Sequence, residues 1–241
     1  MNGYLEKIRS LQSKPMYEKK DILNKNFQLY EDEKMSIYYA PHNIYINQNA
    51  EILIAGITPW WTQTEIAYHV AKRALDDGED EETVYRLCKI NARFAGTMRR
   101  NLIEMLDEIS IQKYLNIDSC KKLFDDTNQL LHTTSVISYP VFYKGKNYTG
   151  SNPSIMKNEI LFDYMHNFGK ELYALKKLRI IIPLGKAVED VLKYWIDKGV
   201  ISEKMCLFGF PHPSGVNAHR KSQFEENRDK LRIKIKDIYE G

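Results

Sequence analysis

A histidine held between two prolines is the residue in this sequence whose setting points most directly to chemistry. His212 lies between Pro211 and Pro213, and Ser214 and Gly215 follow. Because proline fixes its own φ angle and donates no backbone hydrogen bond, we expect the imidazole to sit on a stiff loop. We place this loop between a strand end and a helix start, where free backbone N–H groups suit an anion. A lone histidine is more often structural, but this setting favours a functional one.

The elements that must position this loop follow from the hydrophobic pattern. Short apolar runs bounded by polar residues predict buried strands, and longer stretches with helical spacing separate them. The alternation predicts an α/β protein with a mostly parallel sheet covered on both faces, whose ligands bind outside the carboxyl ends of the strands. We expect one domain over residues 1–241, in which residues 1–37 form an N-terminal helical arm. The expected strands cover residues 51–57, 130–137, 178–184 and 204–208.

Composition narrows the classes of function. The 241 residues carry 35 Lys and Arg against 32 Asp and Glu, a formal net charge of +3, which permits nucleic-acid binding without demanding it. The three cysteines form no CxxC pair, which excludes a zinc ribbon or a four-cysteine iron–sulfur cluster. No apolar run reaches the roughly 18 residues that cross a bilayer. We therefore expect a cytoplasmic protein with no metal, no cofactor and no membrane partner.

Four short motifs occur in an order and spacing that resemble the uracil-DNA glycosylase superfamily. They are Gly-x-x-Pro at residues 56–59, Thr-x-Val at 134–136, Leu-Gly-Lys at 184–186 and His-Pro-Ser at 212–214. The resemblance implies a three-layer sandwich with a central, mostly parallel four-stranded sheet flanked by helices. It also implies metal-free cleavage of the N-glycosidic bond of a base that is flipped out of DNA.

The resemblance assigns roles to the residues around His212. The final histidine of the family stabilises the negative charge that develops on the departing base, and His212 matches it. Ser214 would hold a phosphate that flanks the flipped nucleotide, and Arg220 would add a second phosphate contact. The segment Gly215-Val216-Asn217 matches the part of the loop that the family wedges into the duplex.

The first motif departs from the family at the position that activates water. Many members carry Asp or Asn where this chain has Thr58, and another branch carries Glu where this chain has Ile57. A hydroxyl can position water but is a poor general base, so three interpretations stay open. Thr58 and Gln63 position the water together, or Glu65 supplies the carboxylate, or the chain binds DNA without cutting it.

The expected base pocket also differs from that of enzymes that read uracil. These enzymes often place Asn after the Thr of the second motif, where this chain has Ser135, and Ser cannot bond a base edge bidentately. The shorter side chain leaves room for a bulkier, modified pyrimidine. Trp60 would wall the pocket or stack on the base, with a place in the core as the alternative for both tryptophans. The pocket residues expected from the first two motifs are Gly56, Ile57, Pro59, Trp60, Trp61 and Ser135.

A long loop rich in Gly, Pro and Asn, residues 139–153, is a second candidate surface for DNA. Lys144 and Lys146 lie in it, and residues 142–186 contain eight Lys and Arg against three Asp and Glu. That excess suits a surface that faces phosphates. Asn147 and Tyr148 would read the flipped base in place of the missing Asn of the second motif. A merely solvated loop is the alternative.

The residues and the resemblance together favour a monomeric, monofunctional DNA glycosylase. Its substrate would be uracil or, more in keeping with Ser135, a modified or damaged pyrimidine. A phage-specific modified cytosine as substrate would make the role antiviral defence. A non-catalytic DNA-binding protein of the same fold is the first alternative, and Thr58 supports it. An unrelated α/β enzyme that binds a nucleotide on Ser214 and Gly215 is the second.

Overall fold

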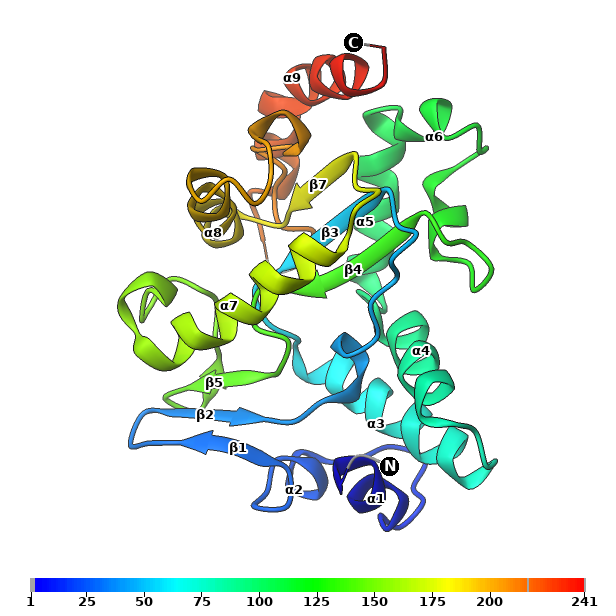
Figure 1. Ribbon diagram of the computed structural model, residues 1–241, viewed down its shortest axis with the longest axis vertical. Coiled ribbons are helices and arrows are strands. Elements are labelled where there is room, and N and C mark those ends of the chain that lie inside the picture. Colours follow the sequence, from blue (N-terminus) through cyan, green and yellow to red (C-terminus); the bar gives the residue numbers. More distant parts are fainter. Residues whose placement is uncertain (1–2, 216, 241) are drawn as a thin grey trace. The chain divides into compact units, whose positions relative to one another are not determined.

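The computed structural model describes residues 3–215 and 217–240, and Figure 1 labels its helices and strands. The chain divides into two compact units that are each built from segments distant in sequence. Unit 1 comprises Met1–Ile46, Thr58–Ala95 and Ile137–Tyr164, and unit 2 comprises Asn47–Ile57, Gly96–Val136 and Met165–Gly241. Val216, which belongs to the expected wedge segment, lies outside the described residues.

Unit 1 is built around two packed helices, α3 (Trp61–Asp76) and α4 (Glu81–Ala92). Three small residues of α3, Ala67, Ala71 and Ala74, recur at helical spacing and are buried, which lets α4 pack close. The Asp80 side chain accepts a hydrogen bond from the Thr83 N–H at 2.8 Å and so caps the first turn of α4. The short helices α1 (Gly3–Arg9) and α2 (Lys19–Ile22) and the 3₁₀ turn η1 (Pro41–Asn43) belong to the same unit.

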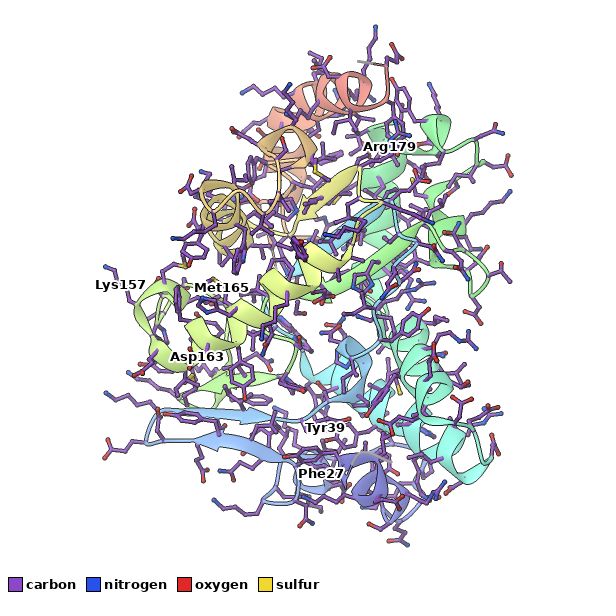
Figure 2. The ribbon with its side chains drawn as sticks, viewed as in Figure 1. Phe27, Tyr39, Lys157, Asp163, Met165 and Arg179 are labelled. Carbon is purple, nitrogen blue, oxygen red and sulfur yellow. The ribbon has the colours of Figure 1, made fainter. Side chains whose placement is uncertain are left out.

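Residues 3–37, expected to form a helical arm, contribute side chains to the core of unit 1. Leu5 and Ile8 of α1 have no exposed surface, and Phe27 and Tyr39, both labelled in Figure 2, are 1% exposed. The Tyr39 N–H donates to the Phe27 carbonyl at 2.7 Å, and the Tyr68 hydroxyl of α3 donates to the Tyr39 carbonyl at 2.8 Å. These bonds join the N-terminal segments to the helices of the same unit.

Unit 1 also contains an antiparallel sheet in the order β1-β2-β5-β6. Its strands are β1 (Gln28–Glu31), β2 (Met35–Tyr38), β5 (Val141–Tyr143) and β6 (Lys146–Asn147). The last two lie in the segment expected as a long loop. Lys144 and Gly145 between them have positive φ angles of 50° and 72°, the combination that a two-residue type I′ hairpin turn requires. The expected DNA-facing loop therefore contains a β-hairpin at one edge of this sheet.

Unit 2 contains a parallel sheet in the order β4-β3-β7. β3 (Ile52–Gly56) pairs with both β4 (Leu131–Ser135) and β7 (Ile180–Pro183), and every residue of these strands is buried. Burial on both faces explains the continuous apolar runs of β3 and β7 in the sequence. The register pairs Gly56 with Ser135 and Ala55 with Pro183, so the three strands end at the same edge.

Helices and 3₁₀ turns connect these strands. Those before β4 are α5 (Thr97–Glu108), α6 (Ile111–Tyr114) and η2 (Cys120–Phe124). Before β7 come η3 (Ile155–Lys157) and α7 (Glu159–Ala174), and after it come α8 (Lys186–Asp197), η4 (Glu203–Met205) and α9 (Arg220–Glu240). Among residues 3–215 and 217–240, none of the helices is long and apolar enough to cross a membrane.

The expected central, mostly parallel four-stranded sheet is wrong. Within the described residues the parallel sheet has three strands, and a separate four-stranded antiparallel sheet is present that the sequence pattern did not predict. The expected fourth strand, residues 204–208, supplies only one parallel bridge, between Cys206 and Ile181. The Ser202 side chain accepts a hydrogen bond from the Lys204 N–H and starts η4, which leaves too few extended residues for a strand.

Candidate active site

The carboxyl edge of the parallel sheet gathers three of the four motifs. Gly56 of the first motif and Ser135 of the second are register partners, and the Val136 N–H donates to the Gly56 carbonyl at 2.9 Å. The Leu184 N–H of the third motif donates to the Ala55 carbonyl at 2.9 Å. This is the edge at which open parallel sheets bind ligands, as the sequence led us to expect.

The His212 loop lies at this same edge. A Cβ added to Gly185, the residue that precedes α8, would lie 3.7 Å from the His212 Cβ. Pro211 and Pro213 on either side of the histidine are both buried. Gly56, Ser135 and Gly185 therefore lie with His212 at one edge of the sheet within unit 2.

The ring of His212 is neutral in this setting. Burial lowers the pKa of His212 to about 4, because an imidazolium would lose its hydration there. The Ser214 N–H donates to His212 Nδ1 at 3.2 Å, so Nδ1 is the acceptor and the proton of the neutral ring is on Nε2. The loop thus presents one defined donor, the Nε2–H, at neutral pH.

Three side chains donate hydrogen bonds to three consecutive carbonyl groups of this loop, and we call these three side chains the loop clamp. Asn217 Nδ2 donates to the His212 carbonyl at 3.2 Å, and Asn101 Nδ2 of α5 donates to the Pro213 carbonyl at 2.8 Å. Arg220 Nη1 donates to the Ser214 carbonyl at 3.2 Å. With its carbonyl groups held in this way, the loop has a fixed shape before any ligand arrives.

Asn101 is a site residue that the sequence reasoning missed. It is 7% exposed and lies 112 positions before the residue that it holds. A signal existed in the helical phase of α5, where Asn101 occurs among the buried residues Leu102 and Met105. A polar side chain on the buried face of a helix needs a partner, and here the partner is the loop.

The surroundings of Ser214 and Gly215 differ from those expected of an anion site. α9 begins at Arg220, so Ser214 and Gly215 do not lie in its first turn. The Ser214 N–H is directed at His212, and Ser214 is 7% exposed, whereas Gly215 is exposed. The phosphate contacts expected of Ser214 and Arg220 and the wedge role expected of Asn217 stay predictions. The side chains of Asn217 and Arg220 are also bonded inside the loop.

A buried polar network ties β4 to α7 beneath the sheet edge. Glu171 accepts hydrogen bonds from Thr134 Oγ1 at 3.1 Å and from His132 Nε2, and the Asn47 N–H lies 3.4 Å from His132 Nδ1. His132 and Glu171 are 1% and 6% exposed. Because strand residues alternate faces, His132 and Thr134 share this face and Ser135 projects to the other. The network therefore fixes the strand that carries Ser135 without using Ser135 itself.

The remaining residues of the first motif belong to unit 1. Thr58 is 4% exposed, and its hydroxyl donates to the Pro59 carbonyl at 3.1 Å. Gln63 Oε1 accepts from the Trp60 N–H at 3.3 Å, and its Nε2 donates to the Ala92 carbonyl at 3.4 Å, so this amide caps the start of α3. The side chains of Trp60 and Trp61 are half-buried.

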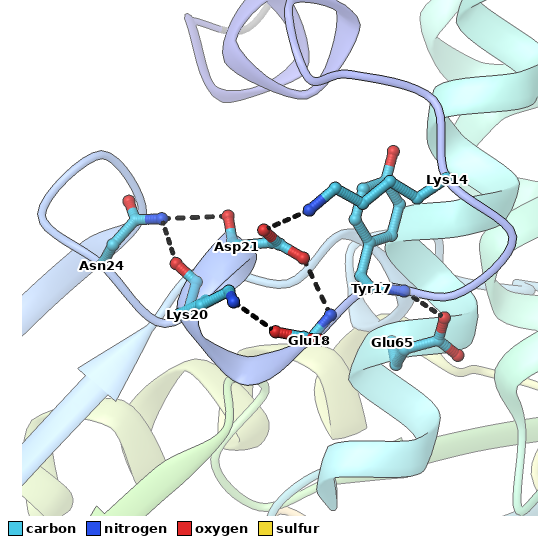
Figure 3. A network of polar contacts seen from close by, with 7 residues as sticks. All are labelled: Lys14, Tyr17, Glu18, Lys20, Asp21, Asn24 and Glu65. Atoms are coloured by element: carbon cyan, nitrogen blue, oxygen red, sulfur yellow. Dashed lines mark hydrogen bonds and ion pairs between the residues drawn. The ribbon is translucent and has the colours of Figure 1, made fainter.

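Glu65, the alternative carboxylate for water activation, has a structural partner. Its Oε1 accepts a hydrogen bond from the Tyr17 N–H at 3.1 Å, as Figure 3 shows. The neighbouring network joins Lys14, Asp21 and Glu18 in the same unit. Glu65 thus anchors the segment that precedes α2, and a role in activating water would have to coexist with that bond.

The hairpin residues expected to contact DNA are placed as follows. Lys144 and Lys146 are exposed, whereas Tyr148 is 1% exposed and its hydroxyl donates to the Pro153 carbonyl. Asn147 Oδ1 is buried and has no hydrogen-bond partner among the described residues. A buried acceptor without a donor is costly, and the role expected of Asn147 in reading the base stays a prediction.

Comparison with known proteins gives one extensive likeness. No family model matches the chain. The chain is 42% identical over 239 residues to YoxB of Bacillus subtilis (strain 168), which carries the description uncharacterized protein. The aligned region covers 99% of this chain and 93% of that protein, so the likeness extends over both units.

Proposed function

The chain belongs to the family of the Bacillus subtilis protein YoxB, and we propose that it is a monofunctional DNA glycosylase of the uracil-DNA glycosylase type. The reaction is hydrolysis of the N-glycosidic bond of a flipped-out uracil or, in our preferred form, of a modified or damaged pyrimidine. It leaves an abasic site in DNA. The proposed cellular role is defence against phages whose DNA carries a modified cytosine.

The observation that carries this proposal is the neutral His212 on a clamped loop at the carboxyl edge of the sheet. When the bond between C1′ and the base nitrogen breaks, the electron pair leaves with the base, and positive charge develops on the sugar. The His212 Nε2–H donates a hydrogen bond to the oxygen on which the negative charge accumulates. Because the donor is fixed in advance, little reorganisation is needed as the charge appears.

A neutral donor suits this step. The leaving base needs stabilisation rather than full protonation, and the Ser214 N–H keeps the proton on Nε2, where the ring can present it. Water then bonds to C1′ and releases its proton to solvent. Thr58 is the residue proposed to position that water, since a hydroxyl whose proton is donated to the Pro59 carbonyl still has lone pairs that accept a hydrogen bond.

Ser135 supports the preference for a modified base. It is 6% exposed and lies at the end of β4. Because Ser stands where enzymes that read uracil have Asn, the site lacks the side-chain amide that would bond plain uracil bidentately. The enzyme is proposed to act as a cytoplasmic monomer on DNA. The cysteines Cys88, Cys120 and Cys206 are free and buried, which agrees with a reducing compartment.

A non-catalytic DNA-binding protein of the same fold is the second candidate, and the first motif favours it. Thr58 is a weak base whose hydroxyl already donates to the Pro59 carbonyl. The Gln63 amide is used at both ends, since its Oε1 caps α3 and its Nε2 donates to the Ala92 carbonyl. This candidate predicts salt-sensitive DNA binding through counterion release, with no base released from any substrate.

The deciding experiment incubates the full chain with DNAs that carry uracil, damaged bases or modified cytosines. Alkaline strand scission reports abasic sites, and mass spectrometry identifies the freed base. His212→Ala should lower the rate of base release by about 10²–10³-fold, the usual loss of one preorganised donor. His69→Ala, at an exposed histidine of α3, is the matched control and should leave the rate unchanged. Base release that survives His212→Ala refutes the assignment, and binding without release from the whole panel favours the second candidate.

A further inference from the structure

A pocket in unit 2 has not been given a role so far. Its volume is about 490 Å³, within the range of small-molecule sites. α5 and its N-cap line one side, and η2 with the residue after it lines the other. The lining residues are Gly96, Arg99, Arg100, Ile103, Glu104, Lys121, Phe124 and Asp125.

The pocket offers a planar stacking surface. The Arg99 guanidinium carbon lies 5.6 Å from the centroid of the Phe124 ring, which is a cation–π contact. Arg99 is half-buried, and this burial lowers the pKa of its guanidinium. Nucleobases stack on guanidinium planes as they do on aromatic rings. Ile103 adds an apolar wall.

Two cations on the rim suit a phosphate. Arg100 and Lys121 are exposed, and within residues 3–215 and 217–240 neither forms an ion pair. Glu104 and Asp125 line the same pocket, and their negative charges would repel a second phosphate. Their carboxylates can accept hydrogen bonds from the exocyclic amine of a base. One phosphate and one base, a single nucleotide unit, match this lining.

The pocket shares its helix with the loop clamp. Asn101 of α5 holds the Pro213 carbonyl, and Thr97 Cγ2 would lie 3.8 Å from a Cβ added to Gly215. Thr97 and Asn101 are four residues apart and lie on one face of α5, whereas Arg99, Arg100 and Ile103 line the pocket. A helix is roughly 10 Å across, so the pocket and the His212 loop are separated by little more than the width of α5.

We propose that this pocket binds a nucleotide of the DNA strand next to the one whose base is excised. Its base stacks on the Arg99 guanidinium, and its phosphate lies between Arg100 and Lys121. The pocket thus extends the contact with substrate beyond the reacting nucleotide and fixes the strand in register with the His212 loop. The identity of the strand rests on the function proposed above.

The test measures binding of a fluorescein-labelled single-stranded oligodeoxynucleotide without a target base, by anisotropy over a range of salt concentrations. The double variant Arg100→Gln, Lys121→Gln should reduce the slope of log K against log salt by about 0.7, since one phosphate of a single strand is no longer neutralised. If the two side chains contribute nothing at 1 M salt, that slope corresponds to about 5-fold weaker binding at 0.1 M.

The control removes the same charge elsewhere in unit 2. Lys113→Gln, Lys170→Gln changes two exposed lysines that line no part of the pocket and form no ion pair among the described residues. Its salt slope should stay close to that of the parent chain. Equal slopes for the two double variants overturn the proposal, as does a parent chain that binds no oligodeoxynucleotide at low salt.

A second readout separates stacking from charge. The oligodeoxynucleotide carries 2-aminopurine at successive positions, and a stacked 2-aminopurine loses fluorescence. Arg99→Lys keeps the charge but removes the plane, so we expect the quenching to be lost while the salt slope stays unchanged. Quenching that persists in this variant overturns the stacking assignment. Neither readout requires base release, so a panel that releases no base, combined with a reduced slope, refutes the glycosylase and leaves the pocket as a DNA site.

Discussion

The contact between α7 and α8 at Gly169 predicts a large effect from one methyl group. A Cβ added to Gly169 would lie 2.2 Å from Cζ2 and 2.3 Å from Cη2 of the Trp195 ring. Carbon atoms in contact are normally about 3.5–4.0 Å apart, so the ring or the helix must move by more than 1 Å. Trp195 is 8% exposed and packs against the ring of His166 at 5.9 Å, which leaves it little freedom to retreat.

The expected magnitude for Gly169→Ala follows from two opposing effects. Overpacking a core costs about 1–3 kcal/mol and sometimes more. Replacing Gly by Ala within a helix regains about 1 kcal/mol of backbone entropy. An overlap this deep places the packing cost at the upper end, so we expect a net loss of about 2–3 kcal/mol in the free energy of unfolding.

The assay is urea unfolding followed by circular dichroism, with Trp195→Leu as the second arm of a double-mutant cycle. Trp195→Leu alone destabilises, because it removes a large buried ring. Once the ring is absent, adding Gly169→Ala should be neutral or should stabilise by up to about 1 kcal/mol. If Gly169→Ala costs the same in both backgrounds, the steric argument is refuted.

Two further predictions concern a buried histidine and the loop clamp. His42 is 2% exposed, and neither of its ring nitrogens has a hydrogen-bond partner among the described residues. Its burial lowers the pKa of His42 to about 3, and the positive charge of Lys89 is a second cause. Only the unfolded chain then takes up this proton between pH 6.5 and 3, so stability falls as the pH falls, by about 1.4 kcal/mol per unit. We expect urea unfolding to show that, between pH 7 and pH 5, the free energy of unfolding of His42→Leu falls by about 2 kcal/mol less than that of the parent chain. Equal decreases in the two proteins would contradict this prediction. For the proposed glycosylase, Asn101→Leu should slow base release by about 5–150-fold in single-turnover assays, the fold-change that corresponds to the 1–3 kcal/mol of a lost buried hydrogen bond. Because Asn101 positions the loop that carries His212, the pH profile should shift as well. A cooperative unfolding transition in urea shows that the variant is folded, and an unchanged rate in that folded variant would remove Asn101 from the site.

The elements that could be predicted from sequence are those whose signal is local. β3 and β7 are buried throughout, so their apolar runs identified them, and β4 was placed to within two residues at each end. The antiparallel sheet was missed because its strands are short, partly exposed and paired over long distances, as in the pairing of Ser36 with Phe142. Residues 82–109 have helical spacing throughout, but α4 ends at Ala92 and α5 begins at Thr97. Phe94 and Gly96 between them adopt positive φ angles, which no hydrophobic spacing reveals.

In the candidate site, too, local features could be predicted from the sequence and features that depend on packing could not. The prolines around His212 and the strand-end position of Ser135 are local features, and the structure brings both to the carboxyl edge of the sheet. The tautomer of His212 and its lowered pKa depend on burial and on the Ser214 N–H, which no pattern encodes. The bonds that occupy Gln63 and Glu65 arise from the packing around α3 and were equally hidden.

The way in which the His212 loop is held limits how it can be transplanted. Asn101 lies in α5, whereas Asn217 and Arg220 lie just before and at the start of α9. The conformation of the loop is therefore stabilised by elements that are far apart in the chain. A synthetic peptide of residues 208–220 would lack the α5 amide and should sample many conformations. A protein engineer who wished to move this loop to another scaffold would have to carry a matching helix with it.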